Sequence, residues 1–410
     1  MDKLISKVAN DTGNGYMDVS INGNDFRIPS VIAKLRNNDN YRIEEFGDKE
    51  SEKEFIEKTF LHELIASVNS PLIKREVKYI IGENATVSAL RSYRLNIYNG
   101  KQKHKQEEGF LLSFAMIAGN SVKEFYEENG EIPSVLKVDV SICASMPIID
   151  SKDRTAIEQL KKAYTQSEHI VSFYNFDKPV QVHLNFVDAI ITCEGEIGKF
   201  QIELADDELK RFIKEDFDKH YPEYQNSSLF EAEKLISLSN MLIVDIGEGT
   251  TELAIFKEDR MEFSSSTSIS SGYGSVLDNA LMSLTKPLKH SERILLKDRS
   301  ELVDLLKDNR ETKKTLVSIA KEHVHEAEFE LTEDIFDGIN LQMKDSINRI
   351  DAVYVFGGGS IPMENILRPL LVDFLEELSD NEIKPVIFIN KKYATSMNRL
   401  GLQRLVEDLL

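Results

Sequence analysis

The chain has 410 residues, with 50 Lys and Arg against 70 Asp and Glu, which gives a formal net charge of −20. This acidic balance disfavours a protein that coats nucleic acid, because such proteins need clustered cations to displace counterions from phosphates. The hydrophobic fraction of 41% and the charged fraction of 29% are typical of a globular protein. At roughly 150 residues per domain, the length predicts two or three domains.

The cysteine content and the hydropathy further restrict the class of protein. The two cysteines, Cys143 and Cys193, are too few for a disulfide framework or a zinc site, and they favour a cytoplasmic protein. The first residues lack the apolar core of a signal peptide, and the longest nearly apolar stretch, Phe110 to Gly119, is too short to cross a membrane. We therefore expect neither a secreted nor a membrane-spanning protein.

The first third of the chain combines strand and helix signals. Strands are predicted at 7–10, 16–21, 26–29 and 77–81, and helices at 54–68 and 106–128. Asn22-Gly23 lies between two of these strands, and this dipeptide is a strong signal for a two-residue β-hairpin turn. The chain is therefore expected to open with a hairpin that leads into an α/β arrangement.

The remainder of the chain repeats the succession of strands and helices. Strands are predicted at 135–141, 180–191, 241–244, 252–256, 261–263 and 352–356, and helices at 151–164, 231–238, 273–285, 311–323, 331–349 and from Pro362 onward. Strands followed by helices in two successive halves predict two α/β domains with a cleft between them.

One pattern occurs twice, each time between two predicted strands. The copies are Asp11-Thr12-Gly13-Asn14-Gly15 and Asp245-Ile246-Gly247-Glu248-Gly249. Paired glycines let the backbone turn tightly and present N–H groups to an anion, and an aspartate at the end of a strand can hold hydrated Mg²⁺. Thr250 and Thr251 add hydroxyl donors after the second copy. Two such hairpins facing each other would clamp the β- and γ-phosphates of a nucleotide.

Two other interpretations of the repeated pattern are less favoured. A single copy would be read as an ordinary β-turn, since Asp, Asn and Gly dominate turns, but two matching copies argue against this. The pattern also resembles the paired Asp-Thr/Ser-Gly loops of aspartic proteases, whose two carboxylates share a proton. Those enzymes are nearly all-β, whereas this chain has several strong helical segments, and Ile246 stands where a hydroxyl would help.

A third glycine cluster, Gly357-Gly358-Gly359-Ser360, follows a predicted strand and precedes a helix. Such a turn permits close backbone approach to a flat ligand and offers a helix N-terminus to a phosphate or ribose. It lacks the Gly-x-Gly-x-x-Gly spacing of a dinucleotide fold, so hydride transfer has no support. Gly272 could also border a nucleotide, although a turn at the start of the helix beginning at Tyr273 is the simpler interpretation.

In their order along the chain these motifs resemble those of the actin/heat-shock-chaperone/sugar-kinase superfamily. Residues 11–15 look like its first phosphate motif, 245–251 like its second, and 356–360 like its adenosine motif. Residues 144–147 and 394–401 stand where the superfamily chain crosses between domains. Together the motifs span nearly the whole chain.

Within this superfamily the sequence is most similar to bacterial actin-like plasmid-segregation proteins of the ParM/Alp type. The similarity rests on Asp-x-Gly-Asn-Gly followed by a hairpin and Ile28-Pro29-Ser30. It implies an actin-like two-domain ATPase fold of the α/β class with a nucleotide cleft between the domains. Domain I would comprise residues 1–187 together with 397–410, and domain II residues 188–396.

The resemblance also implies a function, with its cofactors and partners. The protein would be a polymerising ATPase that binds ATP, or alternatively GTP, with Mg²⁺ and forms nucleotide-dependent filaments in the cytoplasm. Its partners would be further copies of itself and a DNA-binding adaptor at a centromere-like site. Through that adaptor the filaments would segregate plasmid DNA, without direct contact with nucleic acid or membrane.

The resemblance assigns roles to individual residues. Glu194 would orient the attacking water, with Glu196 as the neighbouring alternative, while Asp11 and Asp245 would bind hydrated Mg²⁺ and support catalysis. The residues expected to contact the nucleotide are Asp11, Thr12, Gly13, Asn14, Gly15, Gly247, Glu248, Gly249, Thr250, Thr251, Gly272, Gly357, Gly358, Gly359 and Ser360. Two residues depart from the family pattern: Asn10 replaces an apolar residue, and Glu248 puts a charge inside a phosphate loop.

Other members of the superfamily provide alternative functions. A sugar or acid kinase would need an acceptor pocket and would often carry Lys or Arg shortly after the first turn, where Tyr16 and Met17 stand here. A chaperone would need a long β-rich extension after the adenosine motif, and a membrane-tethered actin would need a basic amphipathic anchor. The kinase remains the alternative to the filament-forming ATPase.

Overall fold

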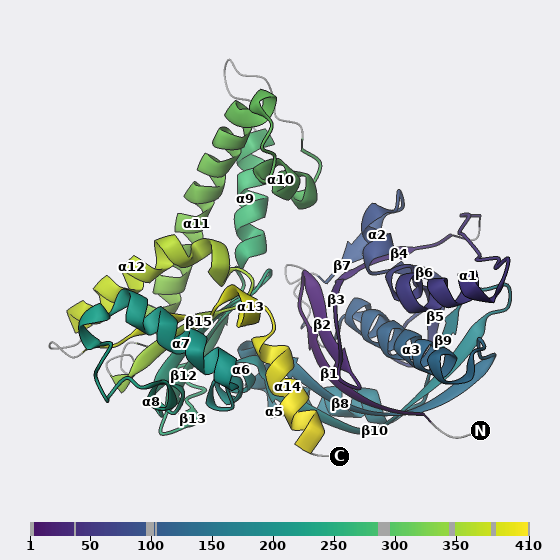
Figure 1. The fold of residues 1–410 in the computed structure, drawn as a ribbon, viewed down its shortest axis with the longest axis horizontal. Helices are drawn as coiled ribbons and strands as arrows, with labels where there is room; N and C mark the ends of the chain where they lie inside the picture. Colours follow the sequence, from purple (N-terminus) through teal and green to yellow (C-terminus); the bar gives the residue numbers. More distant parts are fainter. Residues whose placement is uncertain are drawn as a thin grey trace. The chain divides into compact units, whose positions relative to one another are not determined.

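The computed structural model describes residues 4–36, 38–95, 102, 105–285, 296–343, 349–378 and 383–408. The chain forms two compact units, drawn in Figure 1: unit 1 comprises Met1–Ile197 and Asn398–Leu410, and unit 2 comprises Gly198–Met397. It passes between them within helices α6 (Glu194–Glu203) and α14 (Met397–Asp408). The boundary expected at 187/188 lies upstream of this division, inside strand β10 (Val180–Cys193).

Unit 1 is built on a ten-stranded sheet with the order β3-β2-β1-β8-β10-β9-β5-β6-β4-β7. Its strands are β1 (Leu4–Thr12), β2 (Tyr16–Ile21), β3 (Asn24–Pro29), β4 (Val31–Lys34), β5 (Ile65–Asn69), β6 (Tyr79–Ile81), β7 (Ser92–Arg94), β8 (Val135–Met146), β9 (His169–Phe173) and β10. The predicted hairpin turn is present: Asn22 and Gly23 have φ values of 51° and 82°, the positive values that a two-residue turn between twisted strands requires.

Strands β1, β8 and β10 are mutually parallel neighbours, and this arrangement positions the first candidate loop. Asn10 pairs with Ala144, and Thr192 pairs with Ser145, so the three strands end at the same edge of the sheet. Ligands of α/β proteins bind at the carboxyl ends of parallel strands. Asp11 and Glu194 therefore lie at the same edge of the sheet.

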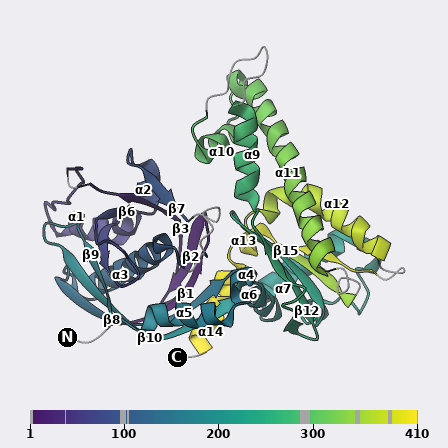
Figure 2. The ribbon, with the colours of Figure 1, turned by 180° about the vertical axis from the view of Figure 1, so that it is seen from behind.

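The helices of unit 1 are α1 (Lys49–Glu54), a π-helical turn (Phe55–Thr59), a 3₁₀ turn (Phe60–His62), α2 (Glu83–Val87), α3 (Glu107–Asn129), α4 (Ile148–Ser151) and α5 (Arg154–Thr165). Helix α3 is buried without interruption from Phe110 to Val122, as expected of a helix that is apolar on nearly all sides. It lies against the sheet in Figure 2.

The single helix expected over 54–68 is wrong in its second half. Helical turns end at His62, and Ile65–Asn69 forms strand β5 between β9 and β6. The first four residues of β5 are buried. A short apolar run with β-branched residues does not by itself distinguish a strand from a buried helix, and pairing with two neighbouring strands decides it here.

Unit 2 contains a second sheet with the order β13-β12-β11-β15-β16, and β14 also pairs with β12. Its strands are β11 (Met241–Ile246), β12 (Thr251–Lys257), β13 (Arg260–Met261), β14 (Thr267–Ile269), β15 (Ala352–Phe356) and β16 (Val386–Phe388). Every residue of β11 and β15 is buried. These two strands are parallel, and Asp245 pairs with Phe356, which brings the second loop beside the glycine turn that follows β15.

The helices of unit 2 are α7 (Asp207–His220), a 3₁₀ turn (Pro222–Tyr224), α8 (Ala232–Ile236), α9 (Tyr273–Thr285), α10 (Arg299–Leu306), a second 3₁₀ turn (Glu311–Lys313), α11 (Lys314–Met343), α12 (Ser360–Leu378) and α13 (Lys391–Ala394). Helices α9 and α11 run side by side, and α10 packs against both (Figures 1 and 2).

Two helices were expected at 311–323 and 331–349, but α11 is one helix of 30 residues. Val324, Ala327 and Leu331 are buried at helical spacing, so they continue the apolar face across the supposed gap. No Gly or Pro interrupts residues 324–330. Residues 344–348 of the second expected helix lie outside the described residues.

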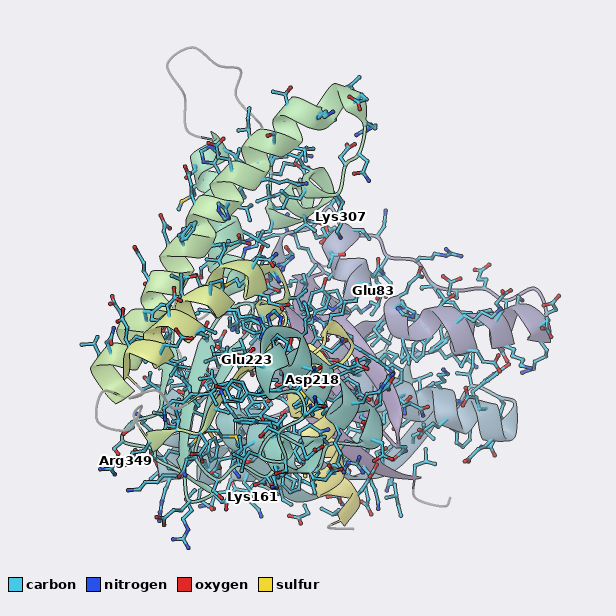
Figure 3. All side chains as sticks on the ribbon, turned by 60° about the vertical axis from the view of Figure 1, so that its left-hand side comes forward. Glu83, Lys161, Asp218, Glu223, Lys307 and Arg349 are labelled. Carbon is cyan, nitrogen blue, oxygen red and sulfur yellow. The ribbon has the colours of Figure 1, made fainter. Side chains whose placement is uncertain are left out.

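The surface of unit 2 carries exposed charged side chains such as Glu223, Lys307 and Arg349, which are labelled in Figure 3. Among the described residues, no helix combines the length and the apolar character needed to cross a membrane. Cys143 and Cys193 lie buried in β8 and β10 and are not joined by a disulfide.

Candidate functional site: two glycine loops

The first loop is the turn between β1 and β2. The Gly13 N–H donates to the Tyr16 carbonyl at 2.9 Å, which closes the turn. A Cβ at Gly13 would lie 2.6 Å from that carbonyl oxygen, so only glycine fits without a shift of the backbone. Ser30, between β3 and β4, supports the loop: its hydroxyl donates to the Gly13 carbonyl at 2.7 Å, and its N–H donates to the Gly15 carbonyl at 2.8 Å.

Asp11 is oriented by the neighbouring strand. The Ser145 hydroxyl, near the end of β8, donates to Asp11 Oδ1 at 3.2 Å. Ser145 belongs to the segment that resembles the first crossing between domains, and no local pattern connects it with Asp11. Because Ser145 satisfies one carboxylate oxygen, it restricts the orientation of the Asp11 side chain.

Asn10, one of the two departures from the family pattern, is the centre of a buried polar cluster. Its amide nitrogen donates to the Ser113 hydroxyl on α3 at 3.2 Å, and its carbonyl oxygen accepts from the Thr12 hydroxyl at 3.0 Å. Tyr164 also hydrogen-bonds with Asn10 and Ser113, while burial raises the pKa of Tyr164 to about 12. Where the family pattern has an apolar residue, this chain therefore has Asn10, which forms neutral hydrogen bonds with its neighbours.

A recess adjoins this cluster within unit 1. Its lining consists of Asn10, Thr12, Leu95, Gln106, Gly109, Phe110, Ala144, Ser145, Met146, Pro147, Leu160 and Tyr164. The first loop thus borders open space on the side that faces α3 and α5.

Glu194 and Glu196, the two candidates for orienting the attacking water, differ in their surroundings. Glu194 is the first residue of α6 and is only 5% exposed, whereas Glu196 is exposed. Desolvation by neighbouring protein atoms raises the pKa of Glu196, and a hydrogen bond with the Cys193 backbone opposes this shift. The sequence could not reveal this difference, because it depends on the packing of α6.

The second loop is the turn between β11 and β12, and it closes in the same way as the first. The Gly247 N–H donates to the Thr250 carbonyl at 2.9 Å. A Cβ at Gly247 would lie 3.1 Å from that carbonyl oxygen, a looser fit than at Gly13. The Thr251 hydroxyl donates to the Ser271 carbonyl at 2.8 Å, which ties the loop to the segment before α9.

The N-terminus of α9 packs directly on the second loop. The N–H groups of Tyr273 and Gly274 donate to the carbonyls of Gly247 and Glu248 at 2.9 and 2.8 Å. These are N–H groups that an isolated helix leaves without a partner. A Cβ at Gly272 would lie 2.6 Å from the Gly247 carbonyl oxygen. Gly272 therefore precedes the helix, as the simpler interpretation expects, and it also contacts the loop.

The glycine turn after β15 encloses Asp245. Gly357 has a φ of +87°, and a Cβ there would lie 2.4 Å from Asp245 Oδ1. The Gly359 N–H donates to the Ile246 carbonyl at 2.8 Å. The Ser360 hydroxyl donates to the Gly357 carbonyl at 2.8 Å where α12 begins. The turn is therefore built so that backbone, without side chains, lies against the Asp245 carboxylate.

Glu248, the second departure from the family pattern, has a cationic partner. Nη1 of Arg299, the first residue of α10, donates to Glu248 Oε1 at 2.9 Å. The same guanidinium binds both carboxylate oxygens of Asp278 on α9, with a Nε to Oδ1 distance of 2.5 Å. No sequence motif pointed to Arg299 and Asp278, because neither lies near the glycine motifs along the chain.

The structure therefore gathers the expected site residues into two sets. In unit 1 the first loop, Ser145 and Glu194 share one edge of the sheet. In unit 2 three segments distant in sequence converge: residues 245–251, Gly272 and residues 357–360.

Comparisons with known proteins support an actin-like fold. Residues 243–369 match the family described as archaeal actin homologue MreB-like, C-terminal. The structure of the actin-like protein Alp7A is similar over 99% of this chain and 97% of that chain, with a TM-score of 0.65 and 13% identity. Bacillus thuringiensis ParM with ATP matches over 100% of both chains, with a TM-score of 0.58 and 16% identity.

Ta0583, an archaeal actin homologue, matches over 99% of both chains, with a TM-score of 0.59 and 15% identity. No curated protein matches the chain significantly. The fold is therefore the actin-like two-domain α/β fold. More particularly, the resemblance to actin-like proteins of the ParM/Alp type is confirmed in the fold.

Proposed function

We propose that this protein binds ATP with Mg²⁺ and hydrolyses it, with the two loops holding the phosphates. The observation that carries the proposal is the convergence in unit 2 of the second loop, Gly272 and the glycine turn around Asp245. Closely packed glycines and helix N-termini are the features that accommodate phosphates. ParM proteins with this fold have been solved with ATP, ADP and AMPPNP, which supports ATP ahead of GTP.

The donor groups suit a magnesium nucleotide. Asp11 and Asp245 supply carboxylate oxygens, the hard ligands that Mg²⁺ prefers, directly or through water. Ser145 already orients the Asp11 carboxylate, and the Gly357 turn leaves the Asp245 carboxylate bordered by backbone. Bound Mg²⁺ would neutralise charge on the phosphates. Residues 357–360 would accept the adenosine, and residues 12–15 and 247–251 would contact the phosphates.

For hydrolysis, we assign Glu194 as the residue that orients the attacking water, with Asp245 and Asp11 completing the catalytic set. Glu194 is the first residue of α6 and is 5% exposed, so its carboxylate is held by packing in a position to accept a hydrogen bond from water. Glu196, whose pKa is raised, is less suited to this role. We expect Glu194→Gln to lower the turnover of bound ATP by about 100-fold or more, with ATP binding retained, and Glu196→Gln to change turnover little.

We propose further that nucleotide binding drives head-to-tail assembly of the chain into filaments that segregate plasmid DNA. Heterologous contacts that do not close into a ring generate filaments. Units 1 and 2 would correspond to actin-like domains I and II of each subunit. The net charge of −20 favours delegating DNA contact to a basic adaptor protein in the cytoplasm, because like charges would repel the phosphate backbone.

A pelleting assay with parallel light scattering tests this function. The protein should form sedimentable polymer with ATP and Mg²⁺ but not without nucleotide, and Asp245→Ala should abolish turnover. A protein that stays monomeric at high concentration with ATP, while it phosphorylates a small metabolite, would instead be a kinase of the same superfamily.

A further inference from the structure

The negative charge of Glu248 lies inside the second loop, so a positive charge must lie close to it if that loop is to accept phosphates. A carboxylate and a polyphosphate repel each other, and the Glu248 side chain is 27% exposed, so water screens it only in part. Arg299 lies 2.9 Å from this carboxylate. An arginine stays protonated at every pH at which the protein is folded, so the compensation is permanent.

We propose that Arg299 is a positioning residue for the nucleotide phosphates: it holds Glu248 and offsets its charge, so that the second loop can accept a polyphosphate. This inference rests on the proposed ATP-binding function. Arg299 acts through Glu248 and the loop, because its guanidinium is already engaged by Glu248 and Asp278.

The surroundings of the guanidinium are shaped for this arrangement. A Cβ at Gly274 would lie 2.6 Å from Arg299 Nη1 and 2.8 Å from Glu248 Cγ. The absence of a side chain at this position of α9 therefore leaves the space in which the ion pair forms. Asp278, one turn further along α9, binds the other edge of the guanidinium. A lysine could not satisfy this planar geometry, because its ammonium is a point charge.

The charges of these three side chains predict a definite order of affinities. Glu248, Asp278 and Arg299 together carry one net negative charge. The net charge of this group becomes −2 when Gln replaces Arg299 and zero when Gln replaces Glu248. With both replacements it is −1 again. ATP affinity should therefore follow the order E248Q, then wild type and the double variant, then R299Q.

The test uses the full-length protein and fluorescent ATP and ADP analogues, each with Mg²⁺ at low and high salt. We expect R299Q to weaken ATP binding about tenfold, equivalent to about 1.4 kcal/mol. The loss should be smaller for ADP, which carries less charge, and smaller at high salt because of screening. E248Q/R299Q should return to within about threefold of wild type, since affinity here follows net charge.

The control is Arg310→Gln, which removes an exposed Arg–Asp308 ion pair elsewhere in unit 2 and should leave nucleotide affinity unchanged. If R299Q does not fold, E248Q alone still tests the inference through its tighter, less salt-dependent ATP binding. Equal loss of ATP and ADP affinity without recovery in the double variant, or E248Q binding no tighter than wild type, would overturn it. Wild-type protein that binds neither nucleotide would instead overturn the proposed function itself.

Discussion

The two glycine loops, residues 11–15 and 245–249, share one motif and one closing hydrogen bond, yet the protein supports them by different means. In unit 1 neutral hydroxyl and amide groups hold the loop: Ser30 binds its carbonyls, and Asn10 anchors the end of β1. In unit 2 backbone from two other segments encloses the loop, and an arginine compensates an added charge. The motif therefore specifies the turn, whereas its surroundings determine which substitutions it tolerates.

The largest effect is expected at Gly357, where backbone conformation and close packing coincide. Gly357→Ala forces a Cβ into a residue with φ of +87° and to within 2.4 Å of Asp245 Oδ1 and of the Ile246 carbonyl oxygen. We expect a destabilisation of about 3 kcal/mol, measured by urea unfolding. Gly358→Ala is the matched control, because its Cβ would meet only Thr395 at 3.7 Å. Equal effects of both substitutions would contradict the described turn.

The equivalent glycines of the two loops allow a direct comparison. A Cβ at Gly13 would lie 2.6 Å from a carbonyl oxygen, against 3.1 Å at Gly247. We expect Gly13→Ala to lower the free energy of unfolding by about 2 kcal/mol and Gly247→Ala by less than about 1 kcal/mol. Gly109→Ala, in α3 beside the first loop, should be neutral or slightly stabilising, because it lies within a helix with room for a methyl group.

The polar cluster beneath the first loop should show coupling. Asn10→Leu removes one hydrogen-bond partner from each of the buried hydroxyl groups of Ser113 and Tyr164 and should destabilise the protein by about 1–2 kcal/mol. Ser113→Ala in the Asn10→Leu background should cost less than in the wild type, and a double-mutant cycle measures the difference. Additive effects would mean that the cluster does not act as a unit.

The smallest expected effect is a pH dependence of folding stability that arises beside the second loop. Tyr273, whose backbone binds the Gly247 carbonyl, donates its hydroxyl to the buried Glu328 carboxylate at 2.9 Å. Burial raises the pKa of Glu328 above its ordinary value, and hydrogen bonds with Tyr273 and His325 only partly oppose this.

Since the folded state holds this proton more tightly than the unfolded state, stability should fall as pH rises from the unfolded pKa through the folded pKa. Glu328→Gln should flatten that part of the profile of thermal unfolding temperature against pH. A profile unchanged by Glu328→Gln would show that other groups dominate.

The features that could be predicted from the sequence are those that depend on residues close together along the chain. The Asn22-Gly23 turn, the apolar helix α3 and the glycine turn after β15 depend on neighbouring residues, and they were predicted. The length of α11 and the strand β5 were not, because packing and strand pairing extend or replace the local pattern there.

The same distinction applies to the candidate site. Asn10 and Glu248 read as departures from a motif because their partners are remote: Ser113 lies 103 residues from Asn10, and Arg299 lies 51 residues from Glu248. The folded structure pairs both of them. Likewise, the burial of Glu194 follows from the position of α6 at the end of β10, which no local pattern indicates.

The most direct test of the central claim is the rate of phosphate release from Mg²⁺-ATP, measured over a range of protein concentrations. An ATPase whose turnover is coupled to assembly should show a rate per molecule that rises steeply above a threshold concentration, and Asp245→Ala should abolish release at every concentration. No release by the wild-type protein at any concentration, or release that Asp245→Ala leaves unchanged, would contradict the account.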